Sequence, residues 1–162
     1  MNCEIKFEPA TEADARTIIE LRKQIWGTSY RGIYPDSMID DFDYVWHIEK
    51  ELQRIKSPAY RVYRIVLNDR NIGYLSTRKT DGIMLQSLYV LQEYQHRGIG
   101  RKAFEFVKQY CTENGAASFT LHCLPENWSA RKFYEKMGGR IIGEDMDNEE
   151  SWMNSVIYRF EA

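Results

Sequence analysis

A single helix and the two strands around it constrain the fold of this chain more than any other feature. Apolar residues recur at helical spacing over 98–113, from Ile99 to Tyr110. β-branched and aromatic residues mark one strand before it, over 83–91, and another after it, over 117–124. A helix of this length between two strands is a crossover, which makes those strands parallel.

The remaining segments add antiparallel strands and further helices to this unit. Two strands flank Asn68-Asp69-Arg70-Asn71 and predict a hairpin, while Thr11-Glu12-Ala13-Asp14 resembles a capping box that opens a helix. The expected elements are a strand near 5–7, a helix after Thr11, a loop over 27–35, an irregular helical stretch over 36–56, hairpin strands over 60–67 and 72–78, a helix over 129–137, and strands near 140–143 and 152–160. This order predicts an α/β fold of the α+β kind, with a mixed, mostly antiparallel central sheet and one parallel pair joined by the crossover helix.

Composition points to one domain, 1–162, because no repeat or linker interrupts the chain and 43% of its residues are apolar. With 22 Lys and Arg against 24 Asp and Glu, the net charge of -2 argues against nucleic acid or an anionic membrane as a partner. No apolar run has the length of a signal peptide or a membrane span, so we expect a cytoplasmic protein. Cys3, Cys111 and Cys123 lack Cys-x-x-Cys spacing, so we expect reduced thiols and no metal site.

The segment Gln95-His96-Arg97-Gly98-Ile99-Gly100 joins a strand to the crossover helix. Its glycines let backbone approach a ligand, and the unpaired N–H groups at a helix N-terminus favour an anion such as a diphosphate. A tight strand-to-helix turn would leave the same pattern. The loop follows a later strand rather than an early one and lacks Gly-Lys-Ser/Thr, so neither a dinucleotide fingerprint nor a Walker loop is indicated.

The combination of motifs is more specific than the loop alone. It consists of Leu88-Tyr89-Val90, the loop 95–100, and then Asn127, Ala130, Phe133 and Tyr134 ahead of Gly138. This pattern resembles the GNAT superfamily of N-acetyltransferases, over nearly the whole chain in element order and most specifically over 84–143.

The resemblance implies acetyl-CoA as cosubstrate and assigns roles within the motifs. The backbone of Leu88, Tyr89 and Val90 would pair with the pantetheine arm, and the N–H groups of the loop would hold the pyrophosphate. The implied coenzyme A contacts are Leu88, Tyr89, Val90, Gln95, His96, Arg97, Gly98, Ile99, Gly100, Arg101, Asn127 and Ala130. Tyr134 would lie near the thioester sulfur and return a proton to the departing thiolate. Alone, Tyr134 would be read as a ring that packs against the sheet.

Two positions depart from the family pattern. Many members carry a glutamate on the strand before the loop, where this chain has Met84, and others carry one five residues before the asparagine, where this chain has His122. Histidine titrates near neutral pH and can accept a proton from an amine, so His122 is the candidate general base. Strand alternation sends it to the face opposite Phe119, Leu121 and Cys123. The alternative is a histidine hydrogen-bonded between sheet and helix.

The expected function is acetyl transfer from acetyl-CoA to a primary amine of a small molecule or peptide, by direct attack in a ternary complex. The alternative is a coenzyme A-binding sensor or structural module without significant turnover. The resemblance also implies that the loop and helices between 27 and 56 select the acceptor. Aromatic residues in or beside this stretch could wall a pocket and acidic residues could attract a cation: Trp26, Tyr30, Tyr34, Trp46, His47, Asp36, Asp40, Asp41 and Asp43. The alternative is that the aromatic residues belong to the core and the acidic residues cap helices or face water. An exposed sheet edge near the last strand favours a homodimer.

Overall fold

The computed structural model describes residues 4–162. Its strands are β1 (Ile5–Pro9), β2 (Tyr60–Leu67), β3 (Arg70–Lys79), β4 (Ile83–Val90), β5 (Ser118–Cys123), β6 (Arg140–Asp145) and β7 (Ser155–Glu161). Its helices are α1 (Ala15–Ser29), α2 (Asp36–Asp40), α3 (Tyr44–Lys56), α4 (Ile99–Glu113) and α5 (Trp128–Lys136), with 3-10 turns η1 (Glu12–Asp14), η2 (Gln92–Tyr94) and η3 (Ser151–Met153). None of the helices in the described part of the chain is long and apolar enough to cross a membrane.

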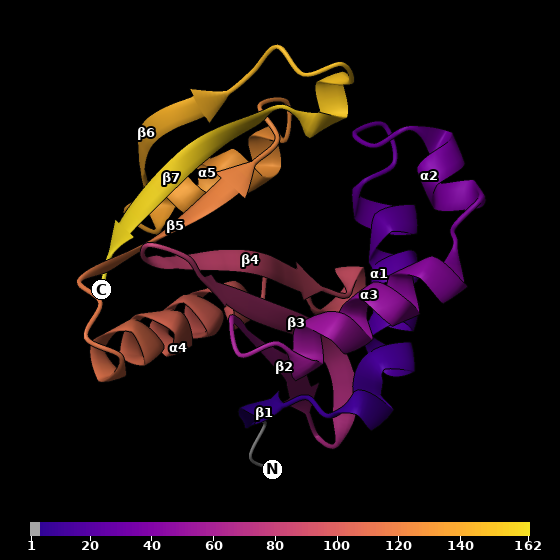
Figure 1. The fold of residues 1–162 in the computed structure, drawn as a ribbon, viewed down its shortest axis with the longest axis horizontal. Coiled ribbons are helices and arrows are strands. Elements are labelled where there is room, and N and C mark those ends of the chain that lie inside the picture. The colour runs from indigo at the N-terminus through magenta and orange to yellow at the C-terminus, as the bar shows by residue number, and fades with distance from the viewer. Residues whose placement is uncertain (1–3) are drawn as a thin grey trace.

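The strands form one mixed sheet in the order β1-β2-β3-β4-β5-β7-β6. Every neighbouring pair is antiparallel except β4 and β5, which α4 connects as a parallel crossover (Figure 1). The predicted mixed sheet with one parallel pair is confirmed. The exposed edge expected near the last strand belongs to β6, of which every residue but Gly143 is exposed. The proposed homodimer stays a prediction.

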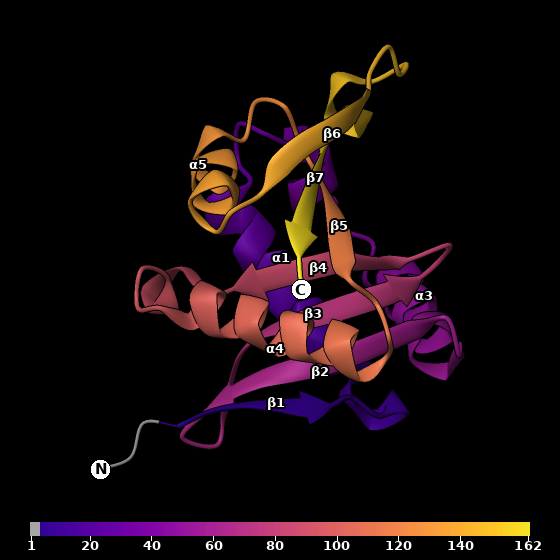
Figure 2. The same cartoon turned by 90° about the vertical axis from the view of Figure 1, so that its left-hand side faces the viewer.

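Helices cover both faces of the sheet (Figure 2). On one face, α4 buries Ala103, Phe104 and Val107 against a core that includes Leu75 from β3 and Phe160 from β7. On the other face, α1 packs a separate cluster with β2 and β3, which includes Ile18, Ile19, Leu21, Ile25, Trp26, Val62 and Tyr74. The apolar spacing within α1 and α4 therefore places each helix against its own side of the sheet.

Several local predictions need correction. The irregular helical stretch is two helices, because the chain leaves α2 to bury Phe42, and Asp43 then caps α3 by accepting a hydrogen bond from Trp46 N at 3.0 Å. The last strand begins at Ser155, since 151–153 form a 3-10 turn. Cys111 and Cys123 are buried, whereas Cys3 lies outside the described residues.

Candidate active site

The parallel strands β4 and β5 separate soon after they pair. Their register contains only Ile83 opposite Phe119 and Met84 opposite Thr120, and beyond this point the two strands diverge (Figure 1). The opposite edge of β4 stays paired with β3 as far as Val90. The stretch 85–90 therefore presents backbone N–H and C=O groups toward the gap without a strand partner, and such groups require a partner from solvent or a ligand.

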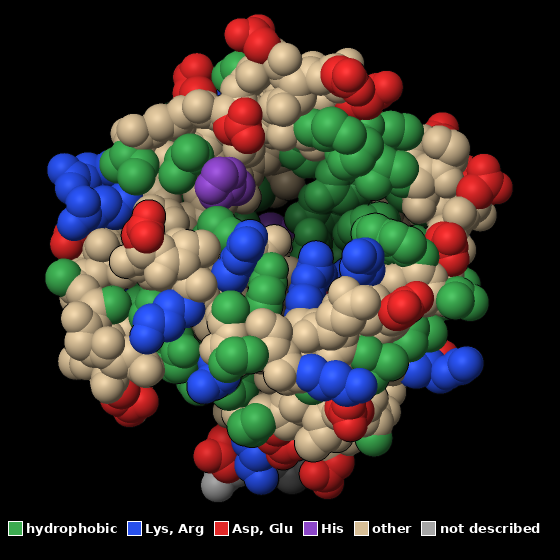
Figure 3. Space-filling model, viewed as in Figure 1, with side chains coloured by type: hydrophobic (Ala, Val, Ile, Leu, Met, Phe, Trp, Pro, Cys, Tyr) green, Lys and Arg blue, Asp and Glu red, His purple; other side chains and the backbone are tan. Residues whose placement is uncertain are grey.

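A cavity of about 250 Å³ occupies the gap between the separated strands. It is lined by Tyr30, Tyr34, Leu85, Gln86, Ser87, Leu88, Tyr89, Leu121, His122, Cys123, Leu124, Asn127, Tyr134, Asp145, Trp152, Met153, Asn154 and Ser155. The molecule is hollowed at the centre of the face in Figure 3, and hydrophobic side chains gather on one side of this hollow. Two predicted catalytic residues, Tyr134 and His122, thus share a cavity with Leu88, Tyr89 and Asn127 of the predicted coenzyme set.

The loop before α4 has the geometry of an anion site. His96 and Gly98 both have left-handed backbone, with φ of 60° and 79°. The first backbone hydrogen bond into the helix runs from Lys102 N to Gly98 O at 3.2 Å, so the N–H groups of 99–101 lack helical partners. His96, Arg97, Gly98 and Arg101 are exposed. Free N–H groups, a helix dipole and two nearby arginines together favour a phosphate at this point.

Three other residues of the predicted set, Gln95, Ile99 and Gly100, serve the fold itself. Gln95 Nε2 donates to Val90 O at 3.0 Å and to Ser29 Oγ at 3.2 Å, which ties the loop to β4 and α1. Ile99 is buried in the core. A Cβ on Gly100 would lie 2.7 Å from Phe133 Cζ of α5, so close helix packing explains this glycine independently of any ligand.

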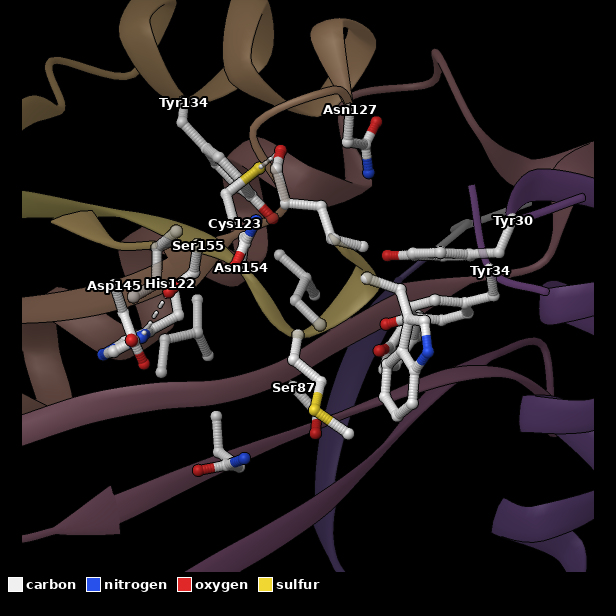
Figure 4. Close-up of a pocket in the computed structure, with 18 residues that line it drawn as sticks. Tyr30, Tyr34, Ser87, His122, Cys123, Asn127, Tyr134, Asp145, Asn154 and Ser155 are labelled. Atoms are coloured by element: carbon white, nitrogen blue, oxygen red, sulfur yellow. Dashed lines mark hydrogen bonds between the residues drawn. The ribbon is translucent and has the colours of Figure 1, made fainter. Parts of the chain in front are cut away.

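The helix α5 brings two predicted residues to the cavity. Asn127 is its N-cap, with Oδ1 accepting from Ala130 N at 3.3 Å, so its amide NH₂ remains to donate to a ligand. Tyr134 projects from the next turns toward Cys123 (Figure 4), and its ring packs 5.8 Å from that of Tyr158. Burial raises the pKa of the Tyr134 hydroxyl above its ordinary value, which keeps it protonated.

His122 lies on the face of β5 opposite the buried residues Phe119, Leu121 and Cys123, as strand alternation predicts. The cavity is lined from both faces of the strand, by His122 and by Leu121 and Cys123. His122 is exposed, and its Nδ1 lies 3.0 Å from Ser155 Oγ on β7. The hydrogen bond therefore runs to a neighbouring strand of the sheet rather than to a helix, and the choice between a general base and a structural histidine stays a prediction. Burial raises the pKa of the neighbouring Cys123 thiol to about 11, so this cysteine is a poor nucleophile.

The wall opposite His122 is aromatic (Figure 4). Tyr30 and Tyr34 stack with ring centroids 4.9 Å apart, and Trp152 meets Tyr34 edge-on at 6.4 Å. Burial raises the pKa of both tyrosine hydroxyls. Of the aromatic residues expected to face the acceptor, only these two line the cavity: Trp26 is in the core, Trp46 is exposed, and His47 contacts Arg22.

Acidic residues expected to attract the acceptor serve local structure instead. Arg31 Nη2 lies 2.8 Å from Asp40 Oδ1, and Arg31 also pairs with Asp36 at 3.2 Å. The carboxylate that does line the cavity is Asp145, at the end of β6. Sequence reasoning missed Asp145, Trp152, Asn154 and Ser155, because the stretch 145–155 belongs to none of the motifs and reaches the cavity only through the pairing of β6 with β7.

Comparisons with known proteins agree with this geometry. Residues 20–139 match the model of the acetyltransferase (GNAT) family. The spermidine N(1)-acetyltransferase of Thermoplasma acidophilum is 24% identical over 156 residues, which cover 90% of this chain and 93% of that protein. The thialysine N-epsilon-acetyltransferase of Sus scrofa is 33% identical over 87 residues, covering 54% of this chain and 47% of that protein. The solved structure of the PaiA N-acetyltransferase from T. acidophilum in complex with coenzyme A has the same fold, with a TM-score of 0.82 at 21% identity over 98% of this chain and 99% of that one.

Proposed function

The chain is an N-acetyltransferase of the acetyltransferase (GNAT) family, and from that premise we propose that it transfers acetyl from acetyl-CoA to a primary amine by direct attack in a ternary complex. The observation that carries the proposal is the cavity between β4 and β5. It brings Tyr134 and His122 to the same space as the unpaired stretch of β4.

The cosubstrate would lie along the free edge of β4. Its pantetheine amides can pair with the backbone of 88–90, which has the same hydrogen-bonding pattern as a strand. Its pyrophosphate can bind the N–H groups of 96–101, with Arg97 and Arg101 beside them. The amide NH₂ of Asn127 faces the same cavity and can donate to the arm.

The chemistry needs three groups around the thioester. The amine nitrogen attacks the carbonyl carbon, the C–N bond forms, and the C–S bond breaks. His122 takes a proton from the amine, directly or through a water, and Tyr134 gives one to the thiolate sulfur. The raised pKa of Tyr134 suits a proton donor, because its hydroxyl is protonated at neutral pH. Cys123 is not needed as a covalent carrier, since its thiol is also protonated there.

The lining of the cavity supports a cationic or neutral acceptor over an acidic one. Asp145 contributes a carboxylate to the cavity wall, and no Lys or Arg of the described residues lines the cavity. The aromatic wall of Tyr30, Tyr34 and Trp152 can stack on an alkylammonium group. Two relatives are acetyltransferases for spermidine and thialysine, both of which are amines. We therefore place alkylamines first among the acceptors to be tested.

A thermal shift and a turnover assay test the proposal together. Acetyl-CoA at about 100 times its Kd should stabilise the fold by about 2.7 kcal/mol, which raises the Tm by about 5–11 °C for a chain of this length. A panel of alkylamines, polyamines and amino acids, read by coenzyme A thiol release, should then show turnover with at least one amine.

The two readouts separate the candidate functions. A thermal shift without turnover across the whole panel would favour the sensor module. Unchanged melting at millimolar acetyl-CoA would count against both. Gly98→Val tests the predicted phosphate site itself. Its added Cβ meets no atom within 4 Å, whereas its side chain would cover the predicted phosphate site. It should lose the ligand-induced shift more than it loses stability, although the φ of 79° strains any side chain there.

A further inference from the structure

Ser155 lies at the start of β7, next to the strand that carries His122. It is 8% exposed, and its Oγ lies 3.0 Å from His122 Nδ1. Figure 4 shows the two side chains linked on one side of the cavity, with Asp145 beside them and the tyrosine wall opposite. Ser155 faces Asp145 across the β6–β7 ladder. The hydrogen bond to Ser155 is the only one that the His122 side chain makes to the described residues.

The direction of this hydrogen bond decides whether His122 can act as a base. A neutral imidazole carries its proton on one nitrogen and accepts at the other. If the Ser155 hydroxyl donates to Nδ1, the proton sits on Nε2 and no nitrogen is free to take another. If Nδ1–H donates to Ser155 Oγ, Nε2 is bare.

Only one of the two directions survives the proposed proton transfer. After His122 takes a proton, both ring nitrogens carry hydrogen and both must donate. A serine that already accepts from Nδ1–H keeps its hydrogen bond through this change. A serine that donates to Nδ1 would have to reverse the bond, and its hydroxyl proton would then need another acceptor at a buried position.

We infer that Ser155 is a positioning residue: its Oγ accepts a hydrogen bond from Nδ1–H of His122 and thereby leaves Nε2 free to take the proton of the acceptor amine. The inference rests on the proposed function for its catalytic consequence. The orientation itself is a property of the folded protein without substrate, and it can be measured separately.

The chain contains an internal reference with the opposite orientation. Arg22 Nη1 lies 3.1 Å from His47 Nδ1, and a guanidinium can only donate. His47 must therefore accept at Nδ1 and carry its proton on Nε2. Burial and the neighbouring Arg22 lower the pKa of His47 to about 4, so it stays neutral at neutral pH. His47 and His122 should show opposite tautomers in the same sample.

Ring-nitrogen NMR tests the orientation directly. The chain has three histidines, so long-range ¹H–¹⁵N spectra of the labelled apo protein at pH 8 can be assigned with His122→Ala and His47→Gln. We expect a protonated Nδ1 for His122 and a protonated Nε2 for His47. In Ser155→Ala, the His122 signals should move toward the Nε2–H form, while those of His47 stay in place. A wild-type His122 protonated on Nε2 would overturn the inference without any variant.

Kinetics then test the consequence for turnover. Loss of one hydrogen bond that orients the base should lower kcat about tenfold in Ser155→Ala, with the KM for acetyl-CoA unchanged within about twofold. Ser155→Thr keeps the hydroxyl and should recover most of the rate. The loss in Ser155→Ala should shrink as pH rises and free amine becomes available.

Other ionisable groups around the cavity bear on that pH profile: Asp145 from β6, Tyr134 from α5, Cys123 from β5, Tyr30 and Tyr34 from the opposite wall, and Tyr89 from β4. Measuring each variant against wild type at every pH cancels their shared contribution. If the tautomer changes in Ser155→Ala but neither Ser155→Ala nor His122→Ala alters turnover, the orientation stands and the proposed base is wrong. If His122→Ala slows turnover and Ser155→Ala leaves both tautomer and rate unchanged, the positioning role is wrong and the base stands.

Discussion

The same substitution at two helical glycines should change stability in opposite directions. In an open helix position, replacing glycine by alanine removes backbone entropy from the unfolded chain and stabilises by about 0.5–1 kcal/mol. Gly27 in α1 is such a position, because a Cβ there meets nothing within 4 Å. Gly100 in α4 is not, because its Cβ would lie 2.7 Å from Phe133 Cζ and 3.3 Å from Cε2.

The magnitude for Gly100→Ala follows from these two terms. Overpacking of a core contact costs about 1–3 kcal/mol, and the helix-propensity gain offsets about 0.5–1 of it. The midpoints of the two ranges give a net loss of about 1.3 kcal/mol, which lowers the Tm by about 3–5 °C for a chain of this length, and the largest loss they allow is about 2.5 kcal/mol. Gly27→Ala should raise the Tm by about 1–4 °C.

Calorimetry of five proteins checks the reasoning: wild type, Gly27→Ala, Gly100→Ala, Phe133→Leu, and Gly100→Ala combined with Phe133→Leu. The shorter leucine removes the atoms that the new Cβ would meet, so Gly100→Ala should become neutral or stabilising when measured against Phe133→Leu alone. If Gly100→Ala raises the Tm as Gly27→Ala does, close packing against Phe133 is not the reason for a glycine at this position of α4. The acetyl-CoA shift of Gly100→Ala then shows whether the glycine also serves the phosphate.

Three further predictions concern Tyr134 and His122 in the cavity and His47 beside Arg22. Tyr134→Phe keeps its ring contacts and should lower kcat by about 10² to 10⁴ with the Kd for acetyl-CoA and the Tm nearly unchanged, and turnover within a few-fold of wild type would make Tyr134 structural. His122→Ala should lose most turnover near neutral pH and recover toward the pKa of the amine, about 10.4 for an alkylamine, whereas a profile parallel to wild type would exclude His122 as the base. The pKa of His47 is lower in the folded protein, about 4, than in the unfolded chain, about 6.5, so between these pH values the proton binds the unfolded chain and not the folded one. The contribution of His47 to the free energy of unfolding is therefore complete above about pH 6.5 and is lost as the pH falls toward 4. In His47→Gln, the Tm should depend less on pH between about pH 4 and pH 6.5. If the slope of Tm against pH is unchanged there, other groups cause it.

Local patterns in the sequence determine much of this fold. The apolar spacing of α4 and the flanking strands predicted a parallel crossover, and β4 and β5 are parallel. The period of two in β5 placed His122 opposite the buried face. Such signals act within a few residues, because side-chain direction follows directly from helical or strand geometry.

Local sequence patterns account for only part of the predicted site. The strand, the loop 95–100 and the pair of Asn127 and Tyr134 are local motifs, and Asn127 and Tyr134 do share the cavity. Their roles in binding and catalysis stay predictions. No local pattern showed that Gly100 faces Phe133, or that Gln95 uses its side chain to hold the loop.

Tertiary structure alone decided what encloses the reaction. The separation of β4 from β5 after one short pairing depends on the whole sheet, and it creates the cavity. Ser155 and Asp145 reach it because β7 inserts between β5 and β6, which brings together residues more than 20 positions apart in the chain. Contacts at such separations depend on how all the layers pack, so periodicity in the sequence carries no signal for them, whereas the elements that pack are already set by it.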